Sequence, residues 1–356
     1  MNSVNSQIST TVIGVGGFGG IVSNELVPNH PEIFFCNIDT DERDLRRSIT
    51  NDSIYIENEL LVNNRKGGIC LTKDFRDVDR RREIRLAMTL ACLRSDIVVT
   101  ISNLAGRTGR GITPSVVKTA SDKCNCLTIA IVVLPICKNS KNNKSIEAAK
   151  IALESIEKNA DAVLVITDEL QYNNMLPSKY SIKQLLLMGA QSFLDPLKSG
   201  QLSFSDYLKE LQPNRYGILG VGVSGDEYVN SLGSILSSPY FPSISLPIRE
   251  AKKVSYQIGC RKLPKLRERA IISEMMQQHT CPSMTVSVAF SSSRECGRQI
   301  FLTALCSQLA VPPSVIFRKL LARRERGKEK NVLSKLMRAF TNPFRISSSD
   351  IKVHCL

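Results

Sequence analysis

Tryptophan is absent from this 356-residue chain, and aromatic residues make up only 6% of it. Histidine is nearly as scarce, with only His30, His279 and His354. That scarcity argues against histidine-based catalysis and against a His-rich metal centre. No apolar run reaches the roughly 18 residues of a membrane span, and the polar, uncharged residues 1–7 do not resemble a secretory signal. We therefore expect a soluble, cytoplasmic protein.

Paired metal-binding cysteines are also missing, although the chain has 11 cysteines. Neither Cys124 with Cys126 nor His279 with Cys281 has the spacing of a zinc site. Most cysteines lie in apolar runs, where a free thiol packs as a small hydrophobic group. We expect reduced, structural cysteines and no bound metal centre of this kind.

Acidic residues are few at the C-terminal end, and the formal charge of +14 is concentrated there. Ten basic residues lie between positions 317 and 345, opposed only by Glu325 and Glu329. Residues 331–340 place apolar side chains on one helical stripe beside basic ones. Such a tail suits anionic lipid, a division-machinery protein or a membrane tether, and equally a solvated helix. Nucleic acid is not the partner we expect.

Strand-like and helix-like segments alternate through the first 170 residues, which predicts a parallel sheet covered on both faces. The expected helices span 79–93 and 145–158, with a long one at 182–194. A second group of strands and a helix at 226–236 predicts a smaller α/β domain. The expected strands of the first group are Thr10–Val15, 33–38, 97–101, 128–133 and 162–166. Those of the second are 215–223, 254–258, 284–290 and 299–305.

A Gly/Thr-rich segment at 102–114 follows the apolar run 97–101. We expect Thr113 to cap the next helix and Pro114 to occupy its first position. Glycines in the preceding loop would let backbone N–H groups approach a phosphate at the helix N-terminus. A second loop of this kind, residues 14–20, follows the first strand. Two such loops in one domain predict a nucleotide held from two sides.

The order of these motifs resembles the tubulin/FtsZ superfamily, and within it the bacterial FtsZ proteins, over residues 8–307. Residues 14–24 resemble its first nucleotide loop, 38–41 the following loop, and 105–111 its G-G-G-T-G-T-G phosphate loop. Segments 161–170, 216–226 and 237–239 agree in order as well. The resemblance implies GTP or GDP as ligand, with Mg²⁺ as a candidate companion ion. The implied contacts are Gly16, Gly17, Phe18, Gly19, Gly20, Asn24, Asp39, Asp41, Ala105, Gly106, Arg107, Thr108, Gly109, Arg110, Gly111, Lys144, Tyr180 and Ser181.

Several of these positions depart from the family pattern. Arg107 and Arg110 stand where the family has Gly and Thr, so either they strain the loop or their guanidinium groups reach the phosphates. Ile21 replaces an Asn that helps hold the nucleotide in FtsZ. Tyr180 could stack on a base, but Ser181 supplies only a hydroxyl where a carboxylate would read guanine.

The loop that completes the neighbouring subunit's active site in FtsZ, N-x-D-x-x-D, is also altered. Its match here is Gln201, Ser203 and Asp206. Asp206 remains as the candidate catalytic acid, but a serine cannot replace the missing carboxylate as a base. We expect weak GTP hydrolysis or none.

The resemblance implies a head-to-tail homopolymer that acts in cell division. The expected units are a lead (1–9), a GTP-binding domain (10–180), a central helix and catalytic loop (181–208), a C-terminal domain (209–308) and a basic tail (309–356). One alternative is an NAD-dependent oxidoreductase, because residues 14–19 read G-x-G-x-x-G and Asp39 follows at the spacing of a ribose-binding acid. Another is a plasmid-partition filament.

Overall fold

The computed structural model describes the N-terminal part of the chain almost continuously and the C-terminal part in segments. The described residues are 9–63, 69–71, 78–93, 95–124, 126–135, 143–167, 187, 190–191, 194, 216–224, 251–260, 262–278, 283–292, 300–307, 311–312 and 314–315. All statements below refer to them.

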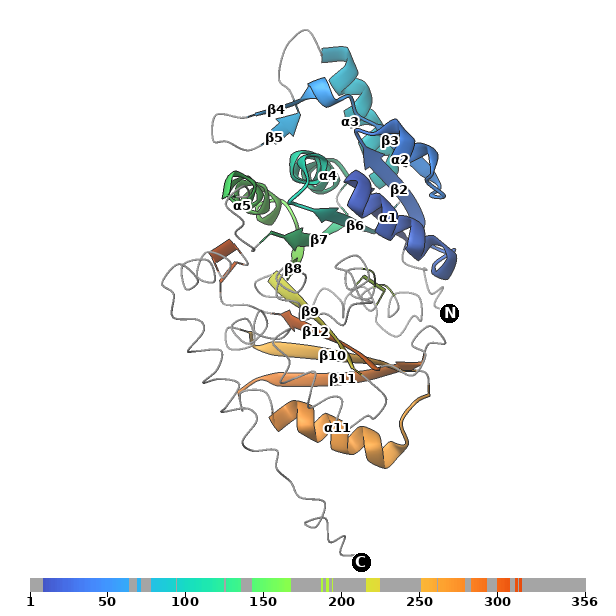
Figure 1. The fold of residues 1–356 in the computed structure, drawn as a ribbon, viewed down its shortest axis with the longest axis vertical. Helices are drawn as coiled ribbons and strands as arrows, with labels where there is room; N and C mark the ends of the chain where they lie inside the picture. Colours follow the sequence, from blue (N-terminus) through green and yellow to red (C-terminus); the bar gives the residue numbers. More distant parts are fainter. Residues whose placement is uncertain are drawn as a thin grey trace, which may run out of the picture.

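Six parallel strands form the N-terminal half of the main sheet, in the order β3-β2-β1-β6-β7-β8 (Figure 1). The central four strands are almost entirely buried. Long runs of Val and Ile suit strands that are covered on both faces. Their bounds are β1 Thr10–Val15, β2 Phe34–Asp39, β3 Asp52–Tyr55, β6 Ile97–Asn103, β7 Leu127–Leu134 and β8 Ala162–Thr167.

One face of this sheet is covered by α1, Gly16–Leu26, which a short 3-10 turn, Val27–Asn29, continues. Val22 and Leu26 are fully buried against alternate residues of β1, β6 and β7. Ala190 and Leu194 join the same cluster, and both are helical. The long helix expected at 182–194 therefore packs on this face wherever it is described.

The opposite face is covered by α3 (Val78–Cys92), α4 (Arg107–Cys124) and α5 (Asn143–Glu157) (Figure 1). Ile84, Met88 and Ala91 of α3 are buried, as the helical spacing predicted. The apolar stripe of α5 packs against β7 and β8. The sheet thus lies between two helical layers, and the predicted α/β class is confirmed.

The sheet continues from β8 into β9 (Tyr216–Ser224), which is parallel to it. β12 (Ile300–Ser307) and β10 (Lys253–Cys260) follow, each antiparallel to the strand before it, and β11 (Thr285–Ser292) is parallel to β10. Helix α11, Leu266–Gln278, lies beside β11 (Figure 1). This smaller α/β part therefore has a mixed sheet. Among the described residues, no helix has the length and apolar content to span a membrane.

Short elements fill the β2–β6 connection. These are α2 (Glu42–Arg46), a 3-10 turn (Asn58–Leu60) and the antiparallel pair β4 (Leu61–Asn63) and β5 (Ile69–Leu71). The β4–β5 pair lies against α4. The sequence interpretation missed β3, β4, β5, α2 and α11, and the helix expected at 226–236 lies outside the described residues.

Ser314 lies against the N-terminal part of the molecule. The backbone N–H and hydroxyl of Ser314 donate to the Glu157 carboxylate at the end of α5, at 2.7 and 2.6 Å. Ser314 is buried. This contact joins a residue beyond β12 in the sequence to the last residue of α5.

Candidate nucleotide-binding site

The candidate site lies at the carboxyl ends of β1, β2 and β6. The chain passes from β1 to β2 on one side and from β6 to β7 on the other, so the strand order reverses between β1 and β6. In open parallel sheets, ligands bind outside the carboxyl ends of the strands at such a reversal. The helices that follow β1 and β6 are α1 and α4, and both begin there.

The first glycine-rich segment is the N-terminus of α1 and not a separate loop. β1 ends at Val15, and the helix begins directly at Gly16, whose φ of 75° favours glycine. The sequence interpretation of an open loop over residues 14–20 is therefore wrong. Because the first turn of a helix leaves its N–H groups unbonded, these residues still present donors to an anion.

The glycines of β1 and α1 have different surroundings. A Cβ on Gly19 would overlap the backbone of Ile101, and one on Gly14 would lie 2.5 Å from Asn37 Oδ1. These two glycines permit close packing of α1 on the strands. Gly17 is different, because the nearest atoms to a Cβ there would belong to the carboxylates of Asp44, at 2.8 Å, and Asp39, at 3.7 Å.

The second segment is corrected in the same way. Helix α4 begins at Arg107, so Thr113 and Pro114 lie inside it and are not its cap and first residue. The reason is Asn103 at the end of β6, whose side-chain and backbone oxygens accept from the N–H groups of Ala105 and Gly106 at 2.9 and 3.2 Å. That turn starts the helix earlier than the Thr-Pro signal indicated.

The two helix N-termini meet. A Cβ on Gly16 would lie 3.3 Å from both the Gly109 nitrogen and the Thr108 Cβ. The Thr108 hydroxyl is hydrogen-bonded to the Thr40 hydroxyl, which follows β2, at 2.9 Å. Segments after three strands therefore converge on one point, as the sequence predicted for Gly16, Thr108 and Gly109.

Asp39 ends β2 at this point and is 6% exposed. Its Oδ1 accepts from the Thr40 N–H at 2.6 Å. Burial is the main cause that raises the pKa of the Asp39 carboxyl above its usual range, and the charges of Asp44 and Asp41 add to it. Sequence reasoning did not select Thr40, although it lies within the 38–41 motif, or Asp44, which lies in no motif.

Asp41 has a structural role in the described contacts. It caps α2 by accepting from the Arg43 N–H at 2.9 Å and forms an ion pair with the Arg43 guanidinium. That hydrogen-bonded pairing lowers the pKa of the Asp41 carboxyl. Both carboxylate oxygens of Asp41 therefore accept hydrogen bonds from Arg43.

Asn24 and Phe18 make contacts within the protein. Asn24 Oδ1 accepts from Asn37 Nδ2, the Ser48 hydroxyl and the Ile49 N–H, at 3.2–3.3 Å. It therefore anchors the segment after α2. The Phe18 ring is partly buried and packs against the core beneath α1.

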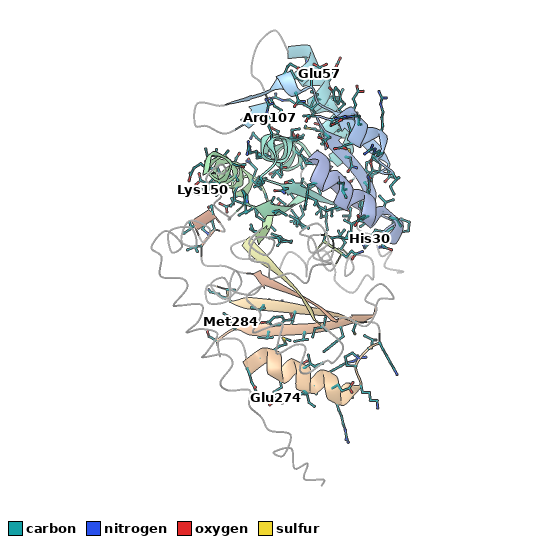
Figure 2. All side chains as sticks on the ribbon, viewed as in Figure 1. His30, Glu57, Arg107, Lys150, Glu274 and Met284 are labelled. Carbon is teal, nitrogen blue, oxygen red and sulfur yellow. The ribbon has the colours of Figure 1, made fainter. Side chains whose placement is uncertain are left out.

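Arg107 and Arg110 occupy the first turn of α4. Arg107 is helical, so the left-handed strain considered for it does not arise. Its guanidinium donates to the Leu61 carbonyl at 2.8 Å, on the side of α4 that faces the β4–β5 pair (Figure 2). Arg110 reaches the other way and donates to the Ala105 carbonyl and the Ser145 hydroxyl at 3.2 and 2.9 Å. Desolvation, with the nearby Arg107 charge, lowers the pKa of Arg110.

Other predicted residues are described in part or not at all. Gly20 and Gly111 lie within α1 and α4. Lys144 lies in the first turn of α5, but its side chain is outside the description. Tyr180, Ser181 and Asp206 lie outside the described residues.

The site accords with the comparisons to known proteins. Residues 9–175 match the model of the Tubulin/FtsZ family, GTPase domain, so this N-terminal part of the chain has the GTPase domain of that family. Cell division protein FtsZ 1 of Thermococcus kodakarensis is 27% identical over 325 residues, covering 87% of this chain and 83% of that protein.

Solved structures show the same fold. The FtsZ dimer of M. jannaschii matches with a TM-score of 0.68 at 18% identity, covering 85% of this chain and 88% of that one. The GTPγS-bound CetZ2 protofilament of Haloferax volcanii matches with a TM-score of 0.58 at 14% identity, covering 90% and 100%.

Proposed function

We propose that this protein is a cytoskeletal GTP-binding protein of cell division, which binds GTP or GDP at the junction of α1 and α4. The observation that carries the proposal is the meeting of the two helix N-termini, where Gly16 lies against Thr108 and Gly109. Two sets of unbonded N–H groups directed at one point suit a chain of phosphates better than a single anion. The family match and the FtsZ relative support guanine nucleotide as the ligand.

The residues present fit such a ligand. The absence of a Cβ at Gly17 lets the Asp44 and Asp39 carboxylates approach the first turn of α1, since a Cβ there would lie 2.8 Å from Asp44 Oδ2 and 3.7 Å from Asp39 Oδ2. The Arg110 Nε is buried without a partner in the described structure. Asp39 and Asp44 would hold Mg²⁺ together with the phosphates, since Mg²⁺ commonly takes one or two carboxylates and completes its shell with phosphate and water.

Assembly into a head-to-tail homopolymer at the division site belongs to the same proposal. The similar solved structures, an FtsZ dimer and a CetZ2 protofilament, support it. Asp206 would then face the nucleotide of the next subunit. Because Gln201 and Ser203 replace the amide and acid of the family loop, hydrolysis would be weak or absent.

Sedimentation of the purified protein with GTP, GTPγS, GDP, ATP or NADH, with phosphate release measured in parallel, tests the proposal. We expect pelleting with GTP and GTPγS and little released phosphate. The matched variants are Thr108→Val, which removes the hydroxyl at the junction, and Thr119→Val, which removes one on the same helix 11 residues away. Folded protein that binds NADH but no guanine nucleotide would refute the proposal.

A further inference from the structure

Three helices near the candidate site have an unusual charge distribution at their N-termini. The first turns of α1, α4 and α5 contain no acidic residue, although carboxylates are favoured there by the helix dipole. The first turn of α4 instead carries Arg107 and Arg110. Two cations at the positive end of a helix are unfavourable unless an anion offsets them.

No carboxylate in the described residues forms an ion pair with either arginine. Their described hydrogen bonds go to neutral oxygens only, those of Leu61, Ala105 and Ser145. The two guanidinium groups also repel each other, and this repulsion adds to the desolvation that lowers the pKa of Arg110. Positive charge therefore accumulates at this helix end with no carboxylate counterion among the described residues.

Arg110 also has donors to spare. Both of its described hydrogen bonds use the same terminal nitrogen, whereas its Nε is buried and unpartnered. A guanidinium has five N–H donors, and a buried one without an acceptor is unfavourable. An anion on this side of α4 would satisfy it. Arg107 and Arg110 leave α4 toward different neighbours, the β4 strand and α5, and so flank its N-terminus.

We propose that Arg107 and Arg110 supply the countercharge for the phosphate chain, so that the triphosphate binds with little dependence on Mg²⁺. The inference rests on the proposed function, since it concerns the same site. Guanidinium groups bind phosphate oxygens through paired N–H donors. They thereby neutralise phosphate charge that a divalent cation would otherwise neutralise. Asp39 and Asp44, on the α1 side, are the groups through which Mg²⁺ would still act.

The test measures GTPγS affinity by calorimetry in MgCl₂ and again in EDTA. For the unaltered protein we expect the two dissociation constants to agree within about threefold. Arg107→Gln/Arg110→Gln removes both charges and keeps polar side chains. Since a charged hydrogen bond contributes about 1.5–3 kcal/mol, this variant should bind about 10- to 100-fold more weakly in EDTA and recover part of that loss in MgCl₂.

Lys118→Gln is the matched control, because it removes one charge from an exposed site on the same helix, paired with Asp122. It should leave both constants unchanged. Arg107→Lys/Arg110→Lys keeps the charge and should retain more binding in EDTA than the glutamine variant. Thermal melts establish that each protein is folded.

The outcomes separate the two proposals. If the unaltered protein binds GTPγS in MgCl₂ and loses it in EDTA as completely as the glutamine variant does, the countercharge inference is overturned and the proposed function stands. If the folded protein binds GTPγS in neither buffer, the proposed function itself fails.

Discussion

Gly19 and Gly20 are neighbours in α1, yet their surroundings are opposite. A Cβ on Gly19 would overlap backbone atoms of Ile101, whereas one on Gly20 would lie 3.4 Å or more from Asn37. We expect Gly19→Ala to destabilise the protein by about 1–3 kcal/mol through overpacking. Gly20→Ala should stabilise it by about 0.5–1 kcal/mol, because alanine loses less entropy in a helix. Chemical denaturation of both variants checks the difference.

The two substitutions control for each other, since they make the same chemical change one residue apart. Equal effects of either sign would contradict the described packing of α1 on β6.

Asp39 is the residue whose ionisation we expect to oppose folding. Its pKa is raised in the folded state, mainly by burial. The folded protein then holds that proton to higher pH than the unfolded chain does, so Asp39 lowers stability as pH rises above its ordinary value of 3.8. Asp39→Asn should therefore be more stable than the unaltered protein at pH 7, with the advantage shrinking as pH falls toward 3.8.

The measurement is the free energy of unfolding of both proteins between pH 7 and pH 4, without nucleotide. The exposed Asp122→Asn serves as the control. A variant that is less stable at pH 7, or whose advantage grows in acid, would contradict the burial argument. If Asp39→Asn gains stability and loses nucleotide affinity, the Asp39 carboxylate serves binding at a cost in folding stability, which is typical of functional residues.

At the scale of elements, α4 contains a proline in its interior. Pro114 is the eighth residue of the helix and has no N–H to donate to the Arg110 carbonyl. We expect Pro114→Ala to stabilise the protein by about 2 kcal/mol, which is the interior proline penalty less the entropy that proline removes from the unfolded chain.

Ser115→Ala is the control on the same turn and should gain no more than about 0.5 kcal/mol from helix propensity. Thermal unfolding of both variants supplies the comparison. If Pro114→Ala is no more stable than Ser115→Ala, the proline at position 114 does not destabilise this helix.

The same helix shows where sequence reasoning reaches its limit. The buried strands were predicted to within two residues at either end, because long Val/Ile runs have few alternatives in an α/β chain. The start of α4 was placed seven residues late, because Thr113-Pro114 is a strong local signal. The signal that prevailed was Asn103, whose two oxygens bind the next N–H groups only once β6 has ended there.

The elements missed altogether are those with weak patterns. β3 has a single buried residue, Ile54, and depends on pairing with β2. Helix α11 buries Ile272 and Met276 but exposes Leu266 and Ile271, so its apolar residues do not form one stripe. In the candidate site, the glycines and Thr108 could be predicted from motifs. Asp44 could not, because only the fold brings α2 beside Gly17.

At the scale of the whole molecule, the proposed filament would share each active site between two subunits. One subunit would contribute the α1–α4 junction, and the next would contribute Asp206. The basic tail at residues 309–356 is a prediction from sequence. Its expected contacts are anionic lipid, a partner protein or solvent.

Restoring the catalytic loop tests this arrangement. Gln201→Asn/Ser203→Asp rebuilds the N-x-D-x-x-D pattern with which Asp206 already agrees. If the low turnover comes from a missing acid that positions and polarises water, the double variant should release phosphate on the order of 10²-fold faster. Because the reaction would take place between subunits, the gain should appear only above the concentration at which the protein pellets.

Adding Asp206→Ala to the double variant should abolish the gain without preventing GTPγS binding. A gain that is independent of protein concentration would mean that the loop acts within its own subunit, and head-to-tail sharing of the site would then be wrong.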